Sequence, residues 1–188
     1  MGHLTTIERR SFLAAAIAAS PAALVAQSTK AKASPKAVRV VRGEDRLGER
    51  HNIGLSTTVF KVLTKDSGGA LFVMEHQSHE KGGPPRHLHH NEDEWFYVVE
   101  GEYIAEIGSD RFQLKPGDSL LAPRQVAHAW AFVGNAAGRL LISFAPANKM
   151  EAFFRDNAKG FSNGKYPNDG AFFRAYDCEL IGPPLTIG

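Results

Sequence analysis

Hydrophobic and polar positions alternate with a period of two through the middle of the chain, a pattern typical of β-strands. Turn-forming runs such as Gly101-Glu102 and Pro116-Gly117-Asp118 separate the alternating stretches. Several short strands at near-regular spacing predict an all-β antiparallel sandwich or barrel. The predicted strands cover Val38–Arg42, Thr57–Leu63, Ala70–His76, Glu94–Glu100, Tyr103–Ile107, Arg111–Leu114, Ser119–Ala122, Ala127–Val133 and Arg139–Ala145.

The C-terminal part of the chain departs from this pattern. Met150, Phe153 and Phe154 have the spacing of one helical face, and Asn148 is a suitable N-cap. We therefore expect a short helix over residues 148–157 that closes one side of the barrel. Aromatic residues are frequent after it, and we expect them to pack on the barrel or on a second subunit: Phe161, Tyr166, Phe172, Phe173 and Tyr176.

The predicted strand Glu94–Glu100 is apolar on both faces, because Trp95, Tyr97 and Val99 alternate with Phe96 and Val98. A sheet with one face in water would carry polar residues at alternate positions. The outer face is therefore expected to be covered by the N-terminal strand, by the C-terminal tail or by a partner chain.

A group of potential metal ligands stands out against this apolar background. His87 and His89 lie two residues apart, so a strand would place both on one face. Glu94 follows at an odd offset, and the polar run between must interrupt the strand for its carboxylate to return to the histidine side. With His128, these residues suit a divalent transition metal with room for water, O2 or substrate. The alternative is that they are solvated or structurally satisfied polar residues.

This spacing resembles the cupin superfamily, whose first motif is G-x5-H-x-H-x4-E-x6-G. The match is complete from His87 to Gly101, although Lys81 stands at the leading glycine position. The second motif, G-x5-P-x-G-x2-H-x3-N, is met by Gly117, Pro123 and His128, but Gln125 and Phe132 replace its glycine and asparagine.

The resemblance covers roughly residues 50–150 and implies a single cupin, a double-stranded β-helix or jelly-roll barrel with a short C-terminal helix. It also implies the metal ligands His87, His89, Glu94 and His128. Glu92 and Asp93 are rival carboxylates, but the spacing to Gly101 favours Glu94. His90 faces away from the other histidines on a continuous strand, so we expect it to be solvated or to support a ligand.

An apolar cavity is predicted beside these ligands. Its lining is predicted to comprise Phe72, Met74, His76, Phe96, Trp130 and Phe132. Such a cavity suits an aromatic or otherwise apolar substrate better than a sugar phosphate. The Gly82–Arg86 run either shapes the cavity mouth or is an ordinary connecting loop.

The run PPRHLHHNEDEWFYVVEGEY resembles quercetin dioxygenase-like single-domain cupins. This resemblance implies a dioxygenase that uses one divalent metal (Fe, Mn, Ni or Co), with Glu94 also accepting the substrate proton as the catalytic residue. Zinc would favour an O2-independent lyase, isomerase or hydrolase on the same scaffold. A third hypothesis is a non-enzymatic cupin that binds small molecules. Cupins are commonly dimers, so a homodimer is expected.

The N-terminus is typical of an exported protein. Arg9-Arg10-Ser11-Phe12-Leu13 precedes an apolar run that ends at Ala26, which resembles a twin-arginine signal peptide over residues 1–26. Cleavage is expected after Ala26 or Ala33, and residues 27–37 are expected to form a flexible leader to a cupin domain over residues 38–188, with core motifs at 82–145. The apolar run is too short for a stable membrane span. The protein would be exported folded, by the twin-arginine machinery, to the periplasm or beyond.

Charge and cysteine content narrow the function further. A net charge of +2 with interspersed signs gives no electrostatic case for binding nucleic acid. The single cysteine, Cys178, cannot form an intramolecular disulfide, and we expect it to be buried as a small apolar group.

Overall fold

The computed structural model describes residues 37–162 and 169–187. The predicted signal peptide, both cleavage sites, nearly all of the predicted leader and Tyr166 lie outside these residues. No helix in the described ranges is long and apolar enough to cross a membrane.

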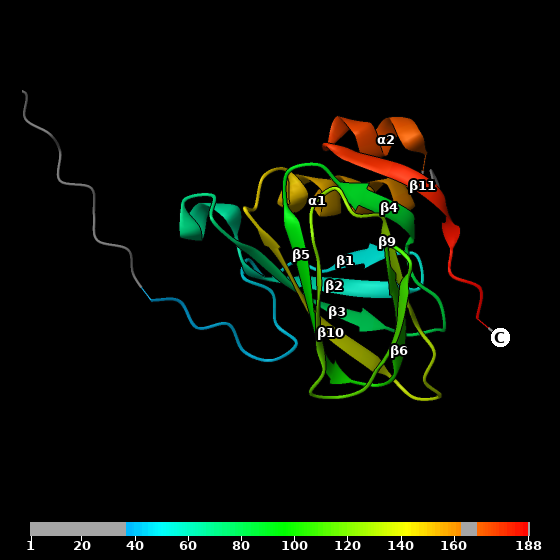
Figure 1. Ribbon diagram of the computed structural model, residues 1–188. Helices are drawn as coiled ribbons and strands as arrows, with labels where there is room; N and C mark the ends of the chain where they lie inside the picture. The colour runs from blue at the N-terminus through cyan, green and yellow to red at the C-terminus, as the bar shows by residue number, and fades with distance from the viewer. Residues whose placement is uncertain (1–36, 163–168, 188) are drawn as a thin grey trace, which may run out of the picture. The chain divides into compact units, whose positions relative to one another are not determined.

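Two antiparallel sheets face each other and form the barrel (Figure 1). One sheet has the order β1-β2-β3-β10-β5-β8, and the other has the order β11-β4-β9-β6-β7. The all-β fold expected from the sequence is therefore confirmed. The strands are β1 (His51–Ile53), β2 (Ser56–Val62), β3 (Phe72–Ser78), β4 (Pro85–His89), β5 (Asp93–Glu100), β6 (Tyr103–Ile107), β7 (Asp110–Leu114), β8 (Ser119–Ala122), β9 (His128–Phe132), β10 (Gly138–Ala145) and β11 (Cys178–Pro184).

The core fills the space between the two sheets. Alternate residues of β3, β5 and β10 are buried from one side, and β6 and β9 supply buried residues from the other. Phe132 packs its ring against Gly138, Gly134 and Gly101, where an added Cβ would lie 2.5, 2.7 and 2.9 Å from the ring. These glycines make room for the large side chain that stands where the second cupin motif has asparagine.

The predicted strand Val38–Arg42 is wrong. This segment forms no strand, and the Val41 carbonyl oxygen accepts from the backbone N–H of Glu44 and from a lysine side chain instead of from a neighbouring strand. Lys61 Nζ donates to the carbonyl oxygens of Val41 and Glu44, at 3.1 and 2.8 Å. Alternation alone could not distinguish this extended segment from a paired strand.

Strand β11 was not predicted, because its sequence ends in Gly182-Pro183-Pro184. Proline cannot donate a backbone hydrogen bond and is therefore restricted to sheet edges and bulges. β11 is such an edge strand: it pairs with β4, and the register shifts after Leu180 and after Gly182.

Besides a short 3-10 turn, η1 (Thr64–Ser67), the described chain has helices α1 (Met150–Ser162) and α2 (Gly170–Ala175). The expected C-terminal helix is present but begins two residues later than predicted. Asn148 does not cap it: this residue has a φ of 39°, and its amide donates to Glu92 Oε2 at 2.8 Å. The helix N-cap of α2 is Asp169, whose side chain accepts from the backbone N–H of Phe172.

The aromatic residues after α1 pack within the same chain. The ring of Phe153 on α1 lies 5.1 to 5.5 Å from the rings of Phe172, Phe173 and Tyr176. In Figure 1, α2 and β11 lie beside β4 at the same end of the barrel as α1. The C-terminal segment thus covers the end of the barrel that holds the histidine strand.

The outer face of β5 stays open in the described part of the chain. Trp95 is 37% exposed and Leu121, its partner on β8, is 52% exposed. The Trp95 and Tyr97 rings stack at 5.9 Å. Neither the described N-terminal residues nor the C-terminal segment buries this pair.

Candidate metal centre and its cavity

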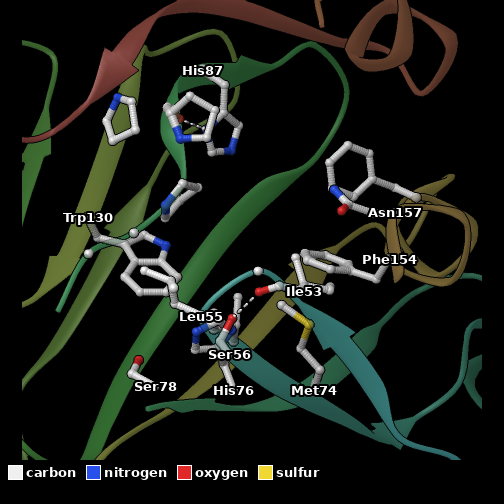
Figure 2. A pocket seen from close by; sticks show the side chains of 18 of the residues that line it. Ile53, Leu55, Ser56, Met74, His76, Ser78, His87, Trp130, Phe154 and Asn157 are labelled. Atoms are coloured by element: carbon white, nitrogen blue, oxygen red, sulfur yellow. Dashed lines mark hydrogen bonds between the residues drawn. The ribbon is translucent and has the colours of Figure 1, made fainter. Parts of the chain in front are cut away.

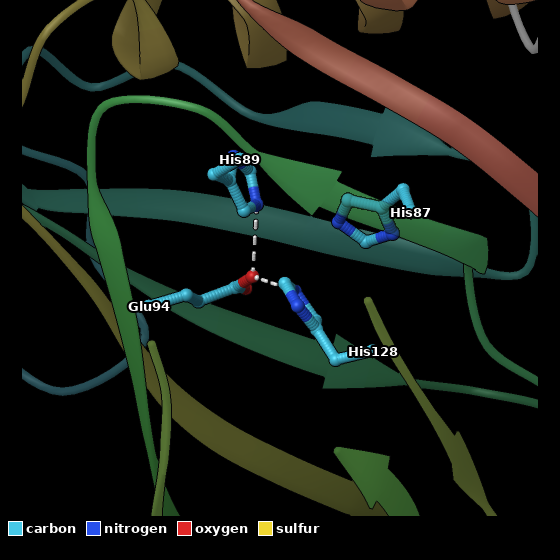
Figure 3. Close-up of side chains that lie close together, drawn as sticks. All are labelled: His87, His89, Glu94 and His128. Atoms are coloured by element: carbon cyan, nitrogen blue, oxygen red, sulfur yellow. Dashed lines mark hydrogen bonds and ion pairs between the residues drawn. The ribbon is translucent and has the colours of Figure 1, made fainter. Parts of the chain in front are cut away.

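The barrel brings His87, His89, Glu94 and His128 together (Figure 3). His87 and His89 share a face of β4, and His87 is the cross-strand partner of His128 on β9. Glu94 comes from β5, which belongs to the opposite sheet. The odd offset between His89 and Glu94 is thereby explained, because the intervening residues carry the chain from one sheet to the other.

The four side chains are buried and close enough to share one ion. Their candidate ligand atoms all lie within 4.8 Å of one another. Glu94 Oε2 lies 3.1 Å from His89 Nε2 and 2.9 Å from His128 Nε2. A group of three imidazoles and one carboxylate, buried and converging, is a ligand set for a divalent transition metal.

The opposite nitrogen of each ring is anchored by the protein. The Nδ1 atoms of His87 and His128 lie 2.8 and 3.0 Å from the carbonyl oxygens of Pro85 and Val126. His89 Nδ1 lies 3.0 Å from Glu92 Oε1. An N–H at each Nδ1 satisfies these acceptors and leaves the Nε2 lone pair free, which is the arrangement that metal-binding histidines use. The residues present therefore fit a metal ion.

His89 has the most extensive support of the three. Glu92, fully buried, bonds to its Nδ1 and in turn accepts a hydrogen bond from Asn148. Cys178 is buried as expected, but its Sγ also lies 3.2 Å from the same Nδ1. The sequence interpretation treated Glu92 only as a rival ligand and missed this supporting position.

Charge is distributed unevenly over the cluster. Burial, together with the neighbouring histidines, lowers the pKa of His87 to about 3. Burial also opposes the charged forms of His89 and Glu94, but the hydrogen bonds of both side chains outweigh this effect. The pKa of His89 is therefore raised well above its usual value, and the pKa of Glu94 is lowered. Before any metal binds, Glu94 is therefore an anion, and a protonated His89 can donate to it from Nε2 while Nδ1 still donates to Glu92.

The remaining acidic and basic neighbours lie outside the cluster. Asp93 pairs with Arg124 at 2.9 Å, and the hydrogen bonds from that guanidinium lower the pKa of Asp93 to about 2. His90 is about half exposed and lies 3.9 Å from Glu179. The prediction that His90 is solvated agrees with this position.

Comparison with known proteins supports the assignment of the barrel's fold. Residues 72–144 match the family model of the cupin domain, Cupin_2, and these residues span the strands that carry all four side chains. The barrel has the cupin fold. An uncharacterized protein of Methanocaldococcus jannaschii, MJ1618, is 27% identical over 65 residues, which are 35% of this chain and 52% of that protein. The chain thus spans about half the length of this curated relative.

Solved structures similar to the chain include KdgF from Halomonas sp., at 20% identity and a TM-score of 0.47, covering 52% of this chain and 86% of that one. An RmlC-like cupin from Shewanella frigidimarina has 26% identity and a TM-score of 0.47, covering 55% and 87%. The nucleoside dehydratase Pac13 from Streptomyces has 17% identity and a TM-score of 0.43, covering 52% and 75%.

A cavity of about 280 Å³ opens beside the four side chains of the cupin barrel, and His87, His89 and Glu94 form part of its wall (Figure 2). Of the residues predicted to line it, Met74, His76 and Trp130 do so. Phe72, Phe96 and Phe132 are instead buried in the core and are not part of the wall. Alternation located the inward face correctly but could not tell which inward residues end at the cavity.

Most of the wall that sequence reasoning missed comes from outside the cupin motifs. Helix α1 contributes Met150, Phe153, Phe154, Asn157 and Phe161. These positions follow helical spacing, so the apolar face predicted for this helix could have indicated them. Asn157 is the polar exception on that face.

The run from Gly82 to Pro85 is also part of the cavity wall. Gly82 bonds through its backbone to Phe132, and an added Cβ on Gly83 would lie 1.8 Å from the carbonyl oxygen of Trp130. Of the two sequence alternatives for this run, its position favours a role in shaping the cavity.

The turn after Pro123 retains the shape that glycine usually provides. Gln125 has a φ of 64°, in the left-handed region, and its backbone N–H donates to the carbonyl oxygen of His89 at 2.7 Å. The departure from the second cupin motif therefore leaves the turn against β4 in place.

Proposed function

We propose that this cupin is a metal-dependent dioxygenase that acts on an aromatic or enolisable small molecule. One observation carries the proposal: three imidazoles anchored through Nδ1 converge with Glu94 at the wall of a mostly apolar cavity. The close resemblance of the histidine-rich run to quercetinase-like cupins supports the choice of reaction.

In this proposal, His87, His89, Glu94 and His128 hold one divalent metal. When bound, the metal supplies a site that binds an enol or phenol oxygen, lowers its pKa and brings O2 beside it. Glu94 lies at the cavity wall as an anion and accepts the proton that the substrate loses. The surrounding apolar residues hold the organic ring and exclude bulk water.

The experiment combines metal analysis with oxygen consumption. Protein purified from its native host, without chelator or affinity metal, is analysed for bound elements. Oxygen uptake is then followed with flavonols, catechols and 1,3-diketones. Near-stoichiometric iron, manganese, nickel or cobalt with substrate-dependent uptake is the expected result.

Variants test the residue assignment directly. His87→Ala and Glu94→Ala should lose the metal or the turnover, and full activity in either would contradict the proposal. Zinc without oxygen uptake would indicate an O2-independent lyase, isomerase or hydrolase instead. Binding of phenolics without turnover would indicate a small-molecule-binding cupin.

We further propose that the protein is exported folded to the periplasm by the twin-arginine machinery and that it is a homodimer. The first part rests on Arg9-Arg10 and the apolar run after them. The second rests on the exposed apolar pair Trp95 and Leu121 on the outer sheet face. Cell fractionation of an Arg9→Lys, Arg10→Lys variant and the solution mass of a Leu121→Glu variant test the two parts separately.

A further inference from the structure

Asn157 is a polar residue on an otherwise apolar face of α1. Met150, Phe153, Phe154 and Phe161 share this face, and all of them line the cavity with Asn157. Asn157 is only 3% exposed. Its position is therefore one at which a core residue would ordinarily be hydrophobic.

The Asn157 side-chain oxygen is buried, and no protein group described in the structure bonds to it. A buried acceptor that lacks a partner destabilises the fold, because it has lost its hydrogen bonds to water. Unpartnered buried polar atoms are uncommon in proteins and call for an explanation such as a bound molecule. Here the residue lines a cavity large enough to hold one (Figure 2).

The rest of the cavity restricts what that molecule can be. Apart from the metal-ligand side chains, the wall is mainly apolar and aromatic, with Trp130 and Phe144 on strands and Phe153 and Phe154 on α1. A volume of about 280 Å³ lies just below the range of roughly 300–1,000 Å³ common for ligand pockets. The occupant must therefore be compact, largely apolar and suited to contact with aromatic rings.

We propose that Asn157 determines ligand specificity by accepting a hydrogen bond from a hydroxyl or N–H group on a compact aromatic ligand. This group is distinct from the oxygen that the ligand directs toward His87, His89 and Glu94. The ligand is thus an aromatic molecule with two separated polar groups. This inference rests on the proposed function for the placement of the first oxygen only.

Binding of matched flavonols tests the inference. The probes are 3-hydroxyflavone and its derivatives with one additional hydroxyl at each ring position. Binding is followed without oxygen through fluorescence of Trp130 in a Trp95→Phe background, since Trp130 lines the cavity and Trp95 does not. At least one derivative should bind roughly three- to tenfold more tightly than the parent, which is the net effect of one neutral hydrogen bond.

The substitution Asn157→Leu should remove that advantage while leaving the affinity for the parent compound equal or higher. It should also raise the melting temperature of the ligand-free protein, because an unpartnered polar atom is removed. Phe154→Leu is the matched control on the same helix face and should weaken the parent and the derivative by similar factors.

Each outcome decides between a ligand-binding and a structural role for Asn157. An advantage that persists in Asn157→Leu, or its absence for every derivative in the wild type, would overturn the inference. A lower melting temperature with unchanged discrimination would assign Asn157 to the fold alone.

Failure of the proposed function is recognised separately. A hydroxyl preference that depends on Asn157, without oxygen uptake, would leave the inference standing and remove the dioxygenase proposal. Oxygen uptake without a hydroxyl preference that depends on Asn157 would support the dioxygenase proposal and remove the inference about Asn157.

Discussion

The two sides of the cavity differ in how their polar groups are satisfied. On the histidine side, formed by β4, β5 and β9, each ring nitrogen that points away from the centre bonds to a protein acceptor. On the α1 side, the wall is apolar and Asn157 has an oxygen that no described residue bonds to. The histidine side is therefore preorganised for an ion, whereas the α1 side leaves one buried acceptor open among apolar side chains.

The largest expected effect comes from Gly83, where the chain enters the histidine strand. An added Cβ would lie 1.8 Å from the Trp130 carbonyl oxygen, so Gly83→Ala must displace either β4 or β9. Overpacking of this kind should lower the free energy of unfolding by about 3 kcal/mol. Urea denaturation of the metal-free protein measures this loss.

Gly43→Ala is the control for Gly83, because Gly43 has open space around it and a φ of 74°. Gly43→Ala introduces the backbone strain of a left-handed residue without a steric clash. It should lower the free energy of unfolding by about 1 kcal/mol. Equal losses in the two variants would mean that the contact of Gly83 with β9 does not position the histidine strand.

His76 lines the cavity, and the pH dependence of protein stability tests whether its surroundings keep it neutral. Burial, together with the nearby His79, lowers its pKa from 6.5 to about 4. As the pH falls, the unfolded chain therefore takes up the proton before the folded protein does. Stability is lost progressively between pH 6.5 and about 4, by about 3 kcal/mol at most.

The comparison of wild type with His76→Gln isolates this contribution, since both proteins retain His87 and the carboxylates. As the pH is lowered from 7 to 4, the free energy of unfolding of the wild type should fall more than that of His76→Gln, because only the wild type carries the buried imidazole. A difference that is independent of pH would show that His76 is not held neutral by its surroundings.

Glu92 offers a way to weaken the histidine side without removing a proposed ligand. Its carboxylate fixes His89 through Nδ1 and is itself fixed by Asn148. Glu92→Ala should lower the affinity for a divalent metal roughly 10- to 100-fold, as loss of such supporting groups does elsewhere. Competition with a chromophoric chelator measures the affinity.

Two further variants sharpen the Glu92 prediction. Glu92→Gln retains an acceptor for His89 and should lose less affinity than Glu92→Ala. Glu179→Ala removes an exposed carboxylate beside the exposed His90 and should leave the affinity unchanged. An unaltered affinity in Glu92→Ala would limit Glu92 to a structural role.

The same contrast explains what the sequence could predict. Motif spacing identified the residues of the histidine side, because β4, β5 and β9 are regular strands whose side chains alternate. It did not identify α2 or β11, where the packing of Phe173 and Cys178 against distant strands decides the structure. Helical spacing placed Met150 and Phe153 on one face and could have placed Asn157 there too, but only the three-dimensional structure shows that this face lines the cavity.

The smallest expected effect concerns Gln125, which supports the histidine side through the backbone of His89. Its φ of 64° lies in the left-handed region, where a residue with a Cβ is strained and glycine is not. Gln125→Gly relieves this strain but increases the freedom of the unfolded chain, so the net gain in stability should be about 0.5–1 kcal/mol. Metal affinity should stay unchanged, because the hydrogen bond to His89 uses the backbone N–H, which glycine retains. A loss of stability would mean that the Gln125 side chain contributes more to the turn than its backbone strain costs, and that the cupin motif glycine is not equivalent here.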